Sequence, residues 1–413
     1  MKPDHELLKR LYGSEEAAAF QEKRLERLAQ EFTARFGADT GIRLISAPGR
    51  TEIAGNHTDH NLGKVLAASV DLDTVAAVRP AEGMTVTLYS DLYDEPFRVD
   101  LTDLEPAADE KQTTSALIRG TAAAMKNAGY KIGGFDAVVT SSVMRGSGLS
   151  SSAAFEVLLV KILSVLFNGD AVPAQENARM SQWAENHYFM KPCGLMDQMA
   201  SAVGGLVYID FGASPAEVEA LSCDFTSAGL CPCVVSAGGD HGSLTDQYAA
   251  IPAEMKQAAA CLGGTVLRDV EDRIYSGIPL LKGRVPDRAI LRALHFADEN
   301  RRVEAMRAAL KARDMPAFLR GVTESGESSW KLLQNLYVPG SDNQEMPLAL
   351  DLSARILAGE GARRIHGGGF AGTILAFVPF EKTELYRETM ESVFGKGSVK
   401  PLYIRPVGAV ELA

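Results

Sequence analysis

The sequence predicts an α+β protein built as two lobes, and three observations predict this fold class. The chain has 413 residues, which is long enough for two domains. Its composition, 46% hydrophobic and 23% charged, is that of an ordinary globular protein with a large core. Segments with helical periodicity are mixed with short apolar runs, as in folds that combine helices with sheets. We expect an N-terminal lobe over residues 1–212 and a C-terminal lobe over residues 213–413.

The first half is predicted to hold most of the strands. Apolar residues at helical spacing predict one long helix over residues 6–36. Pro48, Gly49 and Arg50 follow a short apolar run and are expected to end its strand. Further helices are expected at 115–127, 155–167 and 174–185, and strands at 42–47, 65–70, 74–79, 84–90, 135–142 and 204–211.

The second half is predicted to be mainly helical. Residues 287–314 are rich in Arg, Glu and Ala and predict one or two helices. The other helices are expected at 246–262, 316–336, 348–360 and 383–394, and the strands at 234–237, 373–378 and 399–405.

Charge and cysteine content narrow the class of protein. The net charge is −11, whereas proteins that bind duplexes usually carry a basic surplus, so no nucleic-acid partner is expected. The five cysteines form no pair of CxxC motifs, which argues against a zinc site or a disulfide framework. Residues 1–6 lack the apolar core of a signal peptide, and no run is apolar enough to span a bilayer. We therefore expect a cytoplasmic protein without a membrane partner.

A loop of glycine and serine, residues 145–152, is the stretch around which the chain is organised. It leads into the apolar segment 155–167, so its serines lie where a helix begins. The free N–H groups and the dipole of a helix N-terminus bind anions, and glycines let the backbone approach a ligand closely. The loop is a candidate phosphate cradle; a flexible turn before a helix is the alternative interpretation.

Two other polar turns that contain glycine lie far away in sequence, at residues 48–61 and 366–373. Together with the loop at 145–152, they suggest one shared site. The usual nucleotide motifs, GxxxxGK[ST] and a GxGxxG after a strand, are absent. Asp210, Phe211 and Gly212 spell DFG, but the companion kinase motifs are missing, so we interpret them as the end of a strand and a turn.

Two groups of polar residues invite a functional interpretation. His57, Asp59 and His60 could bind a metal, although a polar loop that hydrogen-bonds a polar ligand fits their tight spacing better. Asp197 is a carboxylate in an apolar stretch, and such a group needs a cationic partner or a catalytic role. Capping of a helix start is the plainer alternative for Asp197.

Five motifs, in order, resemble those of the galactokinase branch of the GHMP small-molecule kinases. Residues 48–59 resemble the signature PGRxNxIGEHxDY, residues 146–153 the phosphate loop GxGLSSSA, and residues 193–198 the motif CGIMDQ. Residues 295–301 resemble a further galactokinase segment, and residues 367–372 the motif GGGFGG. The resemblance covers nearly the whole chain. It implies the two-lobed GHMP kinase fold, with mixed sheets and an active site between the lobes, and phosphorylation of galactose by ATP.

The resemblance implies a role for each matching residue. Asp197 would be the catalytic base at the O1 hydroxyl of the sugar, and Arg50 would keep it ionised and stabilise the transferring phosphoryl group. Ser152 and Glu185 would hold Mg²⁺. The nucleotide phosphates would bind the loop residues Gly146, Ser147, Gly148, Leu149, Ser150, Ser151 and Ser152, and the sugar hydroxyls would contact Asn56, His57, Asp59 and Tyr248.

The sugar-facing part of the signature departs from the family pattern, whereas the phosphate part is nearly intact. Glu52 stands where the family has Asn, Asn56 where it has a sugar-binding Glu, and His60 where it has Tyr. Asn56 removes a charge that would repel a C6 carboxylate, whereas Glu52 adds one if it faces the pocket. Galactose is the first expected substrate, and a C6-altered sugar such as galacturonate is the alternative.

Two other functions belong to different classes. A non-catalytic sensor of galactose and ATP is disfavoured, because Ser152, Glu185, Asp197 and Arg50 are all present. A metal-dependent hydrolase centred on residues 57–60 is the least favoured interpretation. We expect a monomer or a weak homo-oligomer.

Overall fold

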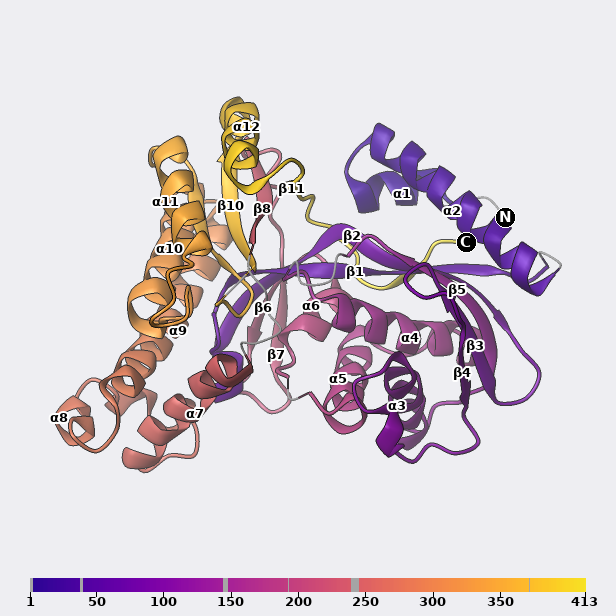
Figure 1. The fold of residues 1–413 in the computed structure, drawn as a ribbon, viewed down its shortest axis with the longest axis horizontal. Helices are drawn as coiled ribbons and strands as arrows, with labels where there is room; N and C mark the ends of the chain where they lie inside the picture. The colour runs from indigo at the N-terminus through magenta and orange to yellow at the C-terminus, as the bar shows by residue number, and fades with distance from the viewer. Residues whose placement is uncertain (1–2, 38–39, 144–147, 192, 239–244, 371) are drawn as a thin grey trace.

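Two β-sheets organise the fold (Figure 1). Among the described residues, the larger sheet has eight strands and the smaller has four. This mixed architecture confirms the predicted fold class. The structure is a computed structural model that describes residues 3–37, 40–143, 148–191, 193–238, 245–370 and 372–413.

The large sheet is built on two long antiparallel strands, β1 (Arg43–Ala54) and β2 (Lys64–Pro80). The strand order is β12-β1-β2-β5-β3-β4, and β6 pairs with β2 and β7 with β6. Strand β2 carries apolar runs at residues 65–68 and 75–78, and it is buried along nearly all of its length, as expected of a strand covered on both faces. The other strands are β3 (Thr85–Ser90), β4 (Phe97–Asp100), β5 (Phe135–Ser141), β6 (Leu206–Asp210), β7 (Glu217–Leu221) and β12 (Val410–Glu411).

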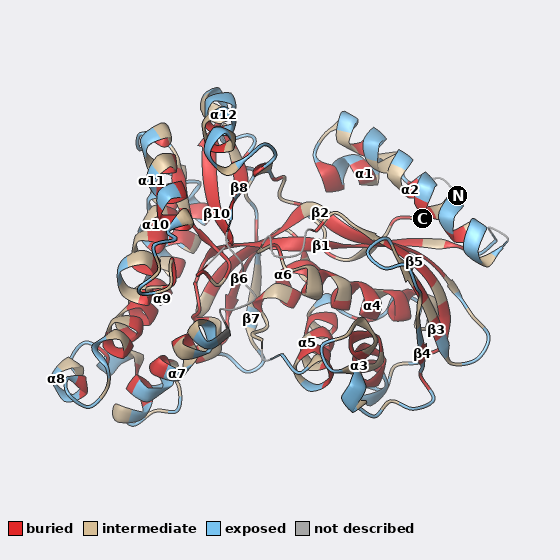
Figure 2. Cartoon of the chain, viewed as in Figure 1, coloured by how far each residue is buried: buried red, intermediate tan, exposed pale blue. Residues whose placement is uncertain are grey.

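Helices cover both faces of the large sheet (Figure 1). The apolar segment after the glycine and serine loop forms α4 (Ser151–Phe167), most of which is buried. Figure 2 shows the contrast with α2, whose outward face is exposed. The helices on the side of α4 are α3 (Thr114–Asn127), α5 (Ala174–Ala184) and α6 (Met196–Val203), and those on the other side are α1 (His5–Tyr12) and α2 (Glu15–Phe36).

The small sheet is antiparallel, in the order β11-β8-β10-β9. Its strands are β8 (Leu230–Gly238), β9 (Ala362–His366), β10 (Gly372–Pro379) and β11 (Val399–Pro401). The helices of this half are α7 (Thr245–Cys261), α8 (Ile278–Leu281), α9 (Asp287–Ala312), α10 (Met315–Ser328), α11 (Glu345–Leu357) and α12 (Thr383–Phe394). Two π-helical turns, Glu185–Phe189 and Ser329–Leu333, extend α5 and α10, and short 3₁₀ turns lie at Asp59–Asn61, Ala108–Glu110, Leu267–Arg273 and Phe380–Lys382.

Several predicted boundaries are wrong. The helix expected over 6–36 is two helices, because Gly13 adopts the left-handed conformation that ends α1 and Ser14 caps α2. The strand expected to end at Pro48 continues to Ala54, and the strands expected at 65–70 and 74–79 are the single strand β2. The helix expected over 316–336 ends at Ser328 and passes into a π-helical turn.

Part of the second half of the sequence completes the large sheet. Strand β7, at residues 217–221, pairs with β6, and β12, at residues 410–411, pairs with β1. The lobe boundary between residues 212 and 213 stays a prediction. None of the helices in the described segments combines the length and the hydropathy that crossing a bilayer requires.

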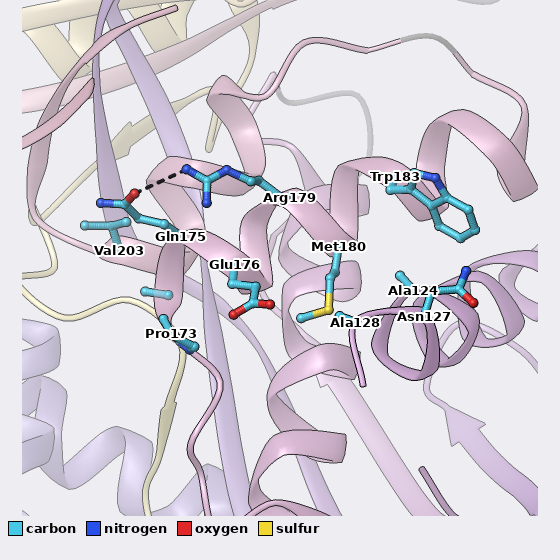
Figure 3. Close-up of a pocket in the computed structure, with 11 residues that line it drawn as sticks. Ala124, Asn127, Ala128, Pro173, Gln175, Glu176, Arg179, Met180, Trp183 and Val203 are labelled. Atoms are coloured by element: carbon cyan, nitrogen blue, oxygen red, sulfur yellow. Dashed lines mark hydrogen bonds between the residues drawn. The ribbon is translucent and has the colours of Figure 1, made fainter. Parts of the chain in front are cut away.

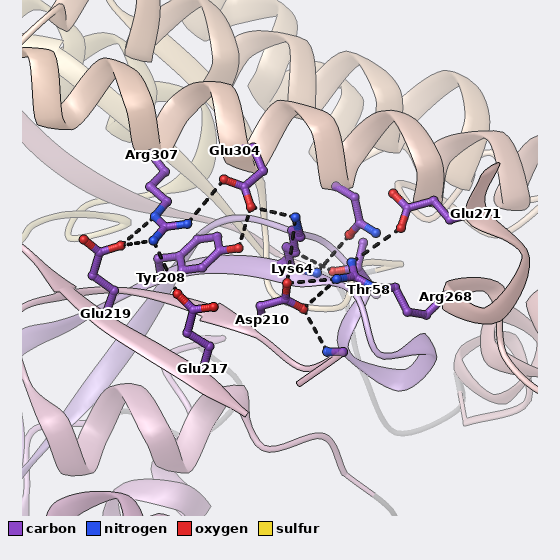
Figure 4. A network of polar contacts seen from close by, with 12 residues as sticks. Thr58, Lys64, Tyr208, Asp210, Glu217, Glu219, Arg268, Glu271, Glu304 and Arg307 are labelled. Carbon is purple, nitrogen blue, oxygen red and sulfur yellow. Dashed lines mark hydrogen bonds and ion pairs between the residues drawn. The ribbon is translucent and has the colours of Figure 1, made fainter. Parts of the chain in front are cut away.

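An ion-pair network ties the large sheet to α9 and the neighbouring 3₁₀ turn (Figure 4). Lys64 of β2 pairs with Glu304 of α9 at 2.6 Å and lies 3.8 Å from Asp210 at the end of β6. Arg268 also pairs with Asp210, at 2.9 Å. The carboxylate of Asp210 then accepts a hydrogen bond from the N–H of Gly212, which confirms that the DFG sequence is a strand end and a turn. The network fixes α9 against the sheet.

Candidate active site

The three polar turns meet in one place, as predicted. Arg50 donates through Nη1 to the carbonyl oxygen of Gly148. Asn56 donates to the carbonyl of Gly367 at 2.9 Å, and Nε2 of His57 lies 2.8 Å from the carbonyl oxygen of Gly368. The first turn therefore contacts both the phosphate-loop segment and the turn that follows β9.

A bulge in β1 brings Arg50 into this site. The register of β1 against β2 shifts between Pro48 and Arg50, which lets a proline lie inside a paired strand. The N–H of Arg50 then bonds to the carbonyl of Leu149 at 3.1 Å. A Cβ on Gly49 would lie 2.9 Å from that same carbonyl oxygen, so the close approach requires glycine.

Arg50 and Asp197 form a bidentate ion pair. Nε of Arg50 lies 2.6 Å from Oδ1 of Asp197, and Nη2 lies 2.7 Å from Oδ2. Asp197 is in the first turn of α6, and its side chain remains partly exposed. Burial alone would raise the pKa of Asp197, but the charge and hydrogen bonds of Arg50, with a hydrogen bond from Ser150, hold the pKa below its usual value. Asp197 is thus an ionised carboxylate with a fixed orientation.

The phosphate-loop segment ends at the N-terminus of α4. Ser150 adopts a left-handed backbone conformation, with φ 58°, and its hydroxyl donates to Oδ2 of Asp197 at 2.6 Å. Leu149 is buried, whereas Ser151 and Ser152 begin the helix. Gly146 and Ser147, also predicted to contact phosphates, lie outside the described residues. The helix N-terminus and Asp197 therefore face the same space.

Glu185 and Ser152 come together as predicted. Glu185 is buried in the π-helical turn after α5, and the hydroxyl of Ser152 donates to its Oε1 at 3.3 Å. Nε2 of Gln198 donates to Oε2 of Glu185 at 2.8 Å, and the ammonium of Lys191 lies 3.4 Å from Oε1. A carboxylate oxygen of Glu185 and the hydroxyl of Ser152 are thus held next to each other at the start of α4.

A cavity of about 190 Å³ adjoins the ion pair of Arg50 and Asp197. Two glycines in its wall leave no room for a side chain. A Cβ on Gly194 would lie 1.7 Å from Oδ2 of Asp59, and one on Gly368 would lie 1.3 Å from the hydroxyl oxygen of Tyr248. Both halves of the chain line it, through Arg50, Glu52, Gly55, Asn56, His57, Asp59, His60, Lys191, Cys193, Gly194, Met196, Asp197, Tyr248, Gly367 and Gly368.

His57 is a neutral ring in this cavity wall. Burial, with His60 nearby, lowers the pKa of His57 to about 3. A carbonyl oxygen can only accept, so the bond to Gly368 places the hydrogen of the ring on Nε2. Nδ1 is then an acceptor, and it has no hydrogen-bond partner in the described part of the chain. The described residues contain no group of three His, Cys, Asp or Glu side chains suited to a metal ion.

A second cavity, of about 480 Å³, is lined in part by Ser151 and Ser152. Sequence reasoning missed it, because its walls come from β3, β5, α3, α4 and the segment before β4, which share no local spacing. Its lining is apolar and aromatic with a few hydroxyls: Thr74, Leu88, Ser90, Leu92, Tyr93, Phe97, Gln112, Thr113, Thr114, Leu117, Val139, Ser141, Val143, Ser151, Ser152, Phe155 and Phe189.

A larger groove, of about 860 Å³, lies apart from these residues, between α3 and α5 (Figure 3). Its walls include Pro173, Met180 and Trp183, and the polar side chains of Gln175 and Arg179 are hydrogen-bonded to each other. None of the predicted site residues lines it. This groove is therefore not part of the candidate active site.

The segment 295–301, which resembles a galactokinase motif, lies on α9 and hydrogen-bonds the backbone of the first polar turn. His295 and Glu299 lie one turn apart on α9 and are fully buried. Nε2 of His295 lies 3.0 Å from the carbonyl oxygen of Asn56, and Oε1 of Glu299 accepts from the N–H of Gly55 at 2.9 Å. These two bonds hold the backbone that carries Asn56 and His57.

Glu299→Gln is expected to reduce stability in a pH-dependent way. Burial opposes ionisation, but Arg302, His295 and Arg364 lower the pKa of Glu299 to about 2, from an ordinary value of 4.5. A lowered pKa stabilises the fold above pH 4.5, and this stability is lost as the pH falls toward 2. The variant should lose about 3 kcal/mol of unfolding free energy at pH 7. The difference from wild type, measured by urea unfolding, should shrink below pH 4.5. Glu16→Gln, at an exposed position of α2, is the control, and an equal deficit at pH 7 and pH 3 would contradict the linkage.

Comparison with known proteins agrees with this arrangement. Residues 30–80 match the galactokinase galactose-binding signature, and residues 116–205 match the N-terminal domain of GHMP kinases. A galactokinase of Mycobacterium bovis is 31% identical over 380 residues, which are 88% of this chain and 98% of that protein. A galactokinase of Streptomyces coelicolor is 30% identical over 379 residues, covering 90% of this chain and 94% of that one.

The chain belongs to the galactokinase family. The predicted family, and with it a sugar kinase of the GHMP superfamily, is therefore confirmed. The fold agrees: the structure of Lactococcus lactis galactokinase, solved with galactose, superposes with a TM-score of 0.82 at 24% identity, over 94% of this chain and 99% of that one. The galactose-binding signature includes β1 and the turn at 55–61, both of which contribute residues to the wall of the 190 Å³ cavity, and β2, which pairs with β1.

Proposed function

We propose that the protein transfers the γ-phosphoryl group of ATP to the O1 hydroxyl of galactose, giving galactose 1-phosphate and ADP. The observation that carries the proposal is the Arg50–Asp197 ion pair, set between the 190 Å³ cavity and the N-terminus of α4. A sugar in that cavity and phosphates at the helix N-terminus would meet at this pair. The galactose-binding signature lies in the wall of the same cavity.

Asp197 is the proposed base. Its ionised carboxylate orients the O1 hydroxyl and accepts its proton as the bond from O1 to phosphorus forms and the bond from phosphorus to ADP breaks. Arg50 contacts Asp197 and the carbonyl of Gly148, so its guanidinium lies where negative charge spreads during transfer. Asp197 therefore positions the sugar hydroxyl, and Arg50 stabilises the negative charge of the phosphoryl group.

The 480 Å³ cavity is the proposed place of the nucleoside. It reaches Ser151 and Ser152, so a base bound among Tyr93, Phe97 and Phe155 would leave its phosphates at the start of α4. Gly148, Leu149 and the three serines 150–152 then provide backbone and hydroxyl groups for those phosphates. His57, Asp59 and Tyr248 stay the proposed polar contacts of the sugar. Asn56 lines the same cavity, but its amide is hydrogen-bonded within the protein.

Ser152 and Glu185 would hold Mg²⁺. Their fit rests on donor chemistry, since a hydroxyl and a carboxylate oxygen 3.3 Å apart are the ligands that Mg²⁺ prefers. Bound there, Mg²⁺ would offset charge on the nucleotide phosphates. Gln198 fixes the other oxygen of Glu185, and Lys191 provides a positive charge beside it.

Glu185→Gln is expected to raise the Mg²⁺ concentration needed for tight ADP binding by at least about 10-fold, because an amide is a poorer ligand than a carboxylate. Calorimetric titration of ADP at increasing Mg²⁺ measures this shift without any turnover. Binding of ADP in EDTA serves as the control and should be unchanged. An unchanged Mg²⁺ dependence would show that Glu185 is not a ligand.

A coupled ADP-release assay with Mg-ATP tests the proposed function. The sugars are galactose, galacturonate, N-acetylgalactosamine, glucose and arabinose. Turnover of galactose supports the proposal, and turnover of galacturonate alone would favour a C6-altered substrate. Bound ATP and galactose without any turnover would instead favour the sensor.

A further inference from the structure

A buried carboxylate, Glu52, lies in the wall of the sugar cavity without a role in the chemistry described above. It is two residues after Arg50 on β1, so both side chains project from the same face of the strand. Glu52 is only 3% exposed. A carboxylate this deeply buried needs polar partners, and its partners indicate what it can bind.

Asn56 lies four residues after Glu52, and every hydrogen-bonding group of its side-chain amide is paired within the protein. The two hydrogens on its Nδ2 go to Oε1 of Glu52 and to the carbonyl of Gly367, each at 2.9 Å. Its Oδ1 accepts from Asn335 at 2.7 Å and from Ser329 at 3.4 Å. An amide nitrogen has two hydrogens, so Asn56 has no donor left for a ligand.

Glu52 differs from Asn56 because one of its oxygens remains available. Oε1 accepts from Nη2 of Arg364 at 2.7 Å as well as from Asn56. Oε2 has no hydrogen-bond partner among the described residues, and Glu52 lines the cavity. Arg364 is fully buried and always charged, so an ionised Glu52 balances a cation that would otherwise be uncompensated. Burial raises the pKa of Glu52, while the charges of Arg364 and Arg50 and the hydrogen bond from Asn56 oppose this shift. Oε2 is therefore a fixed acceptor, and the ion pair with Arg364 favours its ionised form.

We propose that Oε2 of Glu52 accepts a hydrogen bond from a hydroxyl of the bound sugar, and that Glu52, held by Arg364 and Asn56, selects this hydroxyl over a carboxylate. The carboxylate and the amide of the family signature are exchanged in this chain, and Glu52 takes the sugar-facing role. The proposal rests on the proposed function, since it assigns a substrate contact in the same cavity. A sugar acid with its carboxylate at this place would meet a like charge, which argues against galacturonate.

The test compares Glu52→Gln with wild type on galactose and on its 2-, 3-, 4- and 6-deoxy analogues. The kcat/KM for galactose should fall about 10- to 100-fold in the variant, the usual cost of losing a hydrogen bond to a charged group. For the one analogue that lacks the contacted hydroxyl, variant and wild type should be equal. A structural role of Glu52 would instead lower all five sugars equally, and this outcome would overturn the proposal.

Matched variants keep the result interpretable. Glu327→Gln removes a carboxylate that pairs with Arg363, the neighbour of Arg364 on β9, and should leave kcat/KM for galactose unchanged. The double variant Glu52→Asn with Asn56→Glu keeps one carboxylate in the wall and should turn over galactose faster than Glu52→Asn alone, even if Glu52→Gln folds poorly. A double variant no faster than Glu52→Asn would count against the proposal.

The outcomes separate the two proposals. If wild type does not phosphorylate galactose, the proposed function fails, and calorimetry of galactose binding to wild type and Glu52→Gln still tests the contact. If wild type phosphorylates galactose and Glu52→Gln equals it on every sugar, only the role of Glu52 fails.

Discussion

Asp197→Asn is expected to lower the turnover of galactose by about 10²- to 10⁴-fold, the usual contribution of a positioned general base. The amide keeps the shape of the side chain but cannot accept the proton of the O1 hydroxyl. It also leaves the guanidinium of Arg50 without its charged partner. The coupled ADP-release assay measures the loss, and calorimetry should find ADP binding within a few-fold of wild type.

Asp136→Asn is a suitable control for this prediction. Asp136 lies on β5 and pairs with Arg79 at 3.3 Å, away from the cavity. The Asp136→Asn variant should turn over galactose at the wild-type rate. An Asp197→Asn protein that kept more than a tenth of the wild-type rate would show that proton acceptance by this carboxylate is not part of the rate-limiting chemistry.

Asp73→Ala is expected to destabilise the fold by about 3–5 kcal/mol, because it removes a fully buried carboxylate that has charged partners. Oδ1 accepts from Arg24 at 2.6 Å, while Oδ2 accepts from Tyr12 at 2.5 Å and from Arg405 at 3.2 Å. Its loss would leave the buried guanidinium of Arg405 uncompensated. Burial alone would raise the pKa of Asp73, but Arg24 and Arg405 hold the pKa below its usual value, so this stability is present at neutral pH and lost in acid.

Denaturant unfolding at pH 7 measures this effect. Asp136→Ala removes a carboxylate whose ion pair is more exposed and should cost less than about 1 kcal/mol. Equal losses for the two variants would mean that the cluster around Asp73 contributes no more than a surface pair. The partners of Asp73 lie in three different segments: Tyr12 in α1, Arg24 in α2 and Arg405 after β11. Loss of Asp73 should therefore make α2 unfold more easily, together with the rest of the protein.

The parts of the fold that were predictable are those with strong local signals. Helices α4 and α9 follow from long periodic segments, and the strand at 135–142 is confirmed within one residue. The break at Pro48 was wrong because proline normally disfavours a paired strand, and only the bulge against β2 allows β1 to continue. Short strands such as β4 and β7 were missed, although each pairs with the strand just before it, because four or five residues are too few to show a clear alternation.

The candidate site also has residues that could be predicted from local motifs and residues that could not. The motifs located Arg50, Asp197, Ser152 and Glu185, and the structure brings them together. The motifs could not show that the amide of Asn56 is saturated, because three of its partners are more than 250 residues away in sequence. The buried partner Arg364 and the supporting residue Glu299 are likewise visible only once β9 and α9 are packed against the signature.

The two π-helical turns have a consequence for the history of the chain. Each turn contains one residue more than a regular α-helical turn would need, and each stands next to the site, at Glu185 and just before Asn335. Such a turn is what a single inserted codon leaves behind when a helix absorbs the extra residue without shifting its neighbours. Differences of one residue between relatives should therefore collect at these two turns, and a gap placed elsewhere in an alignment would move Glu185 or Asn335 out of correspondence.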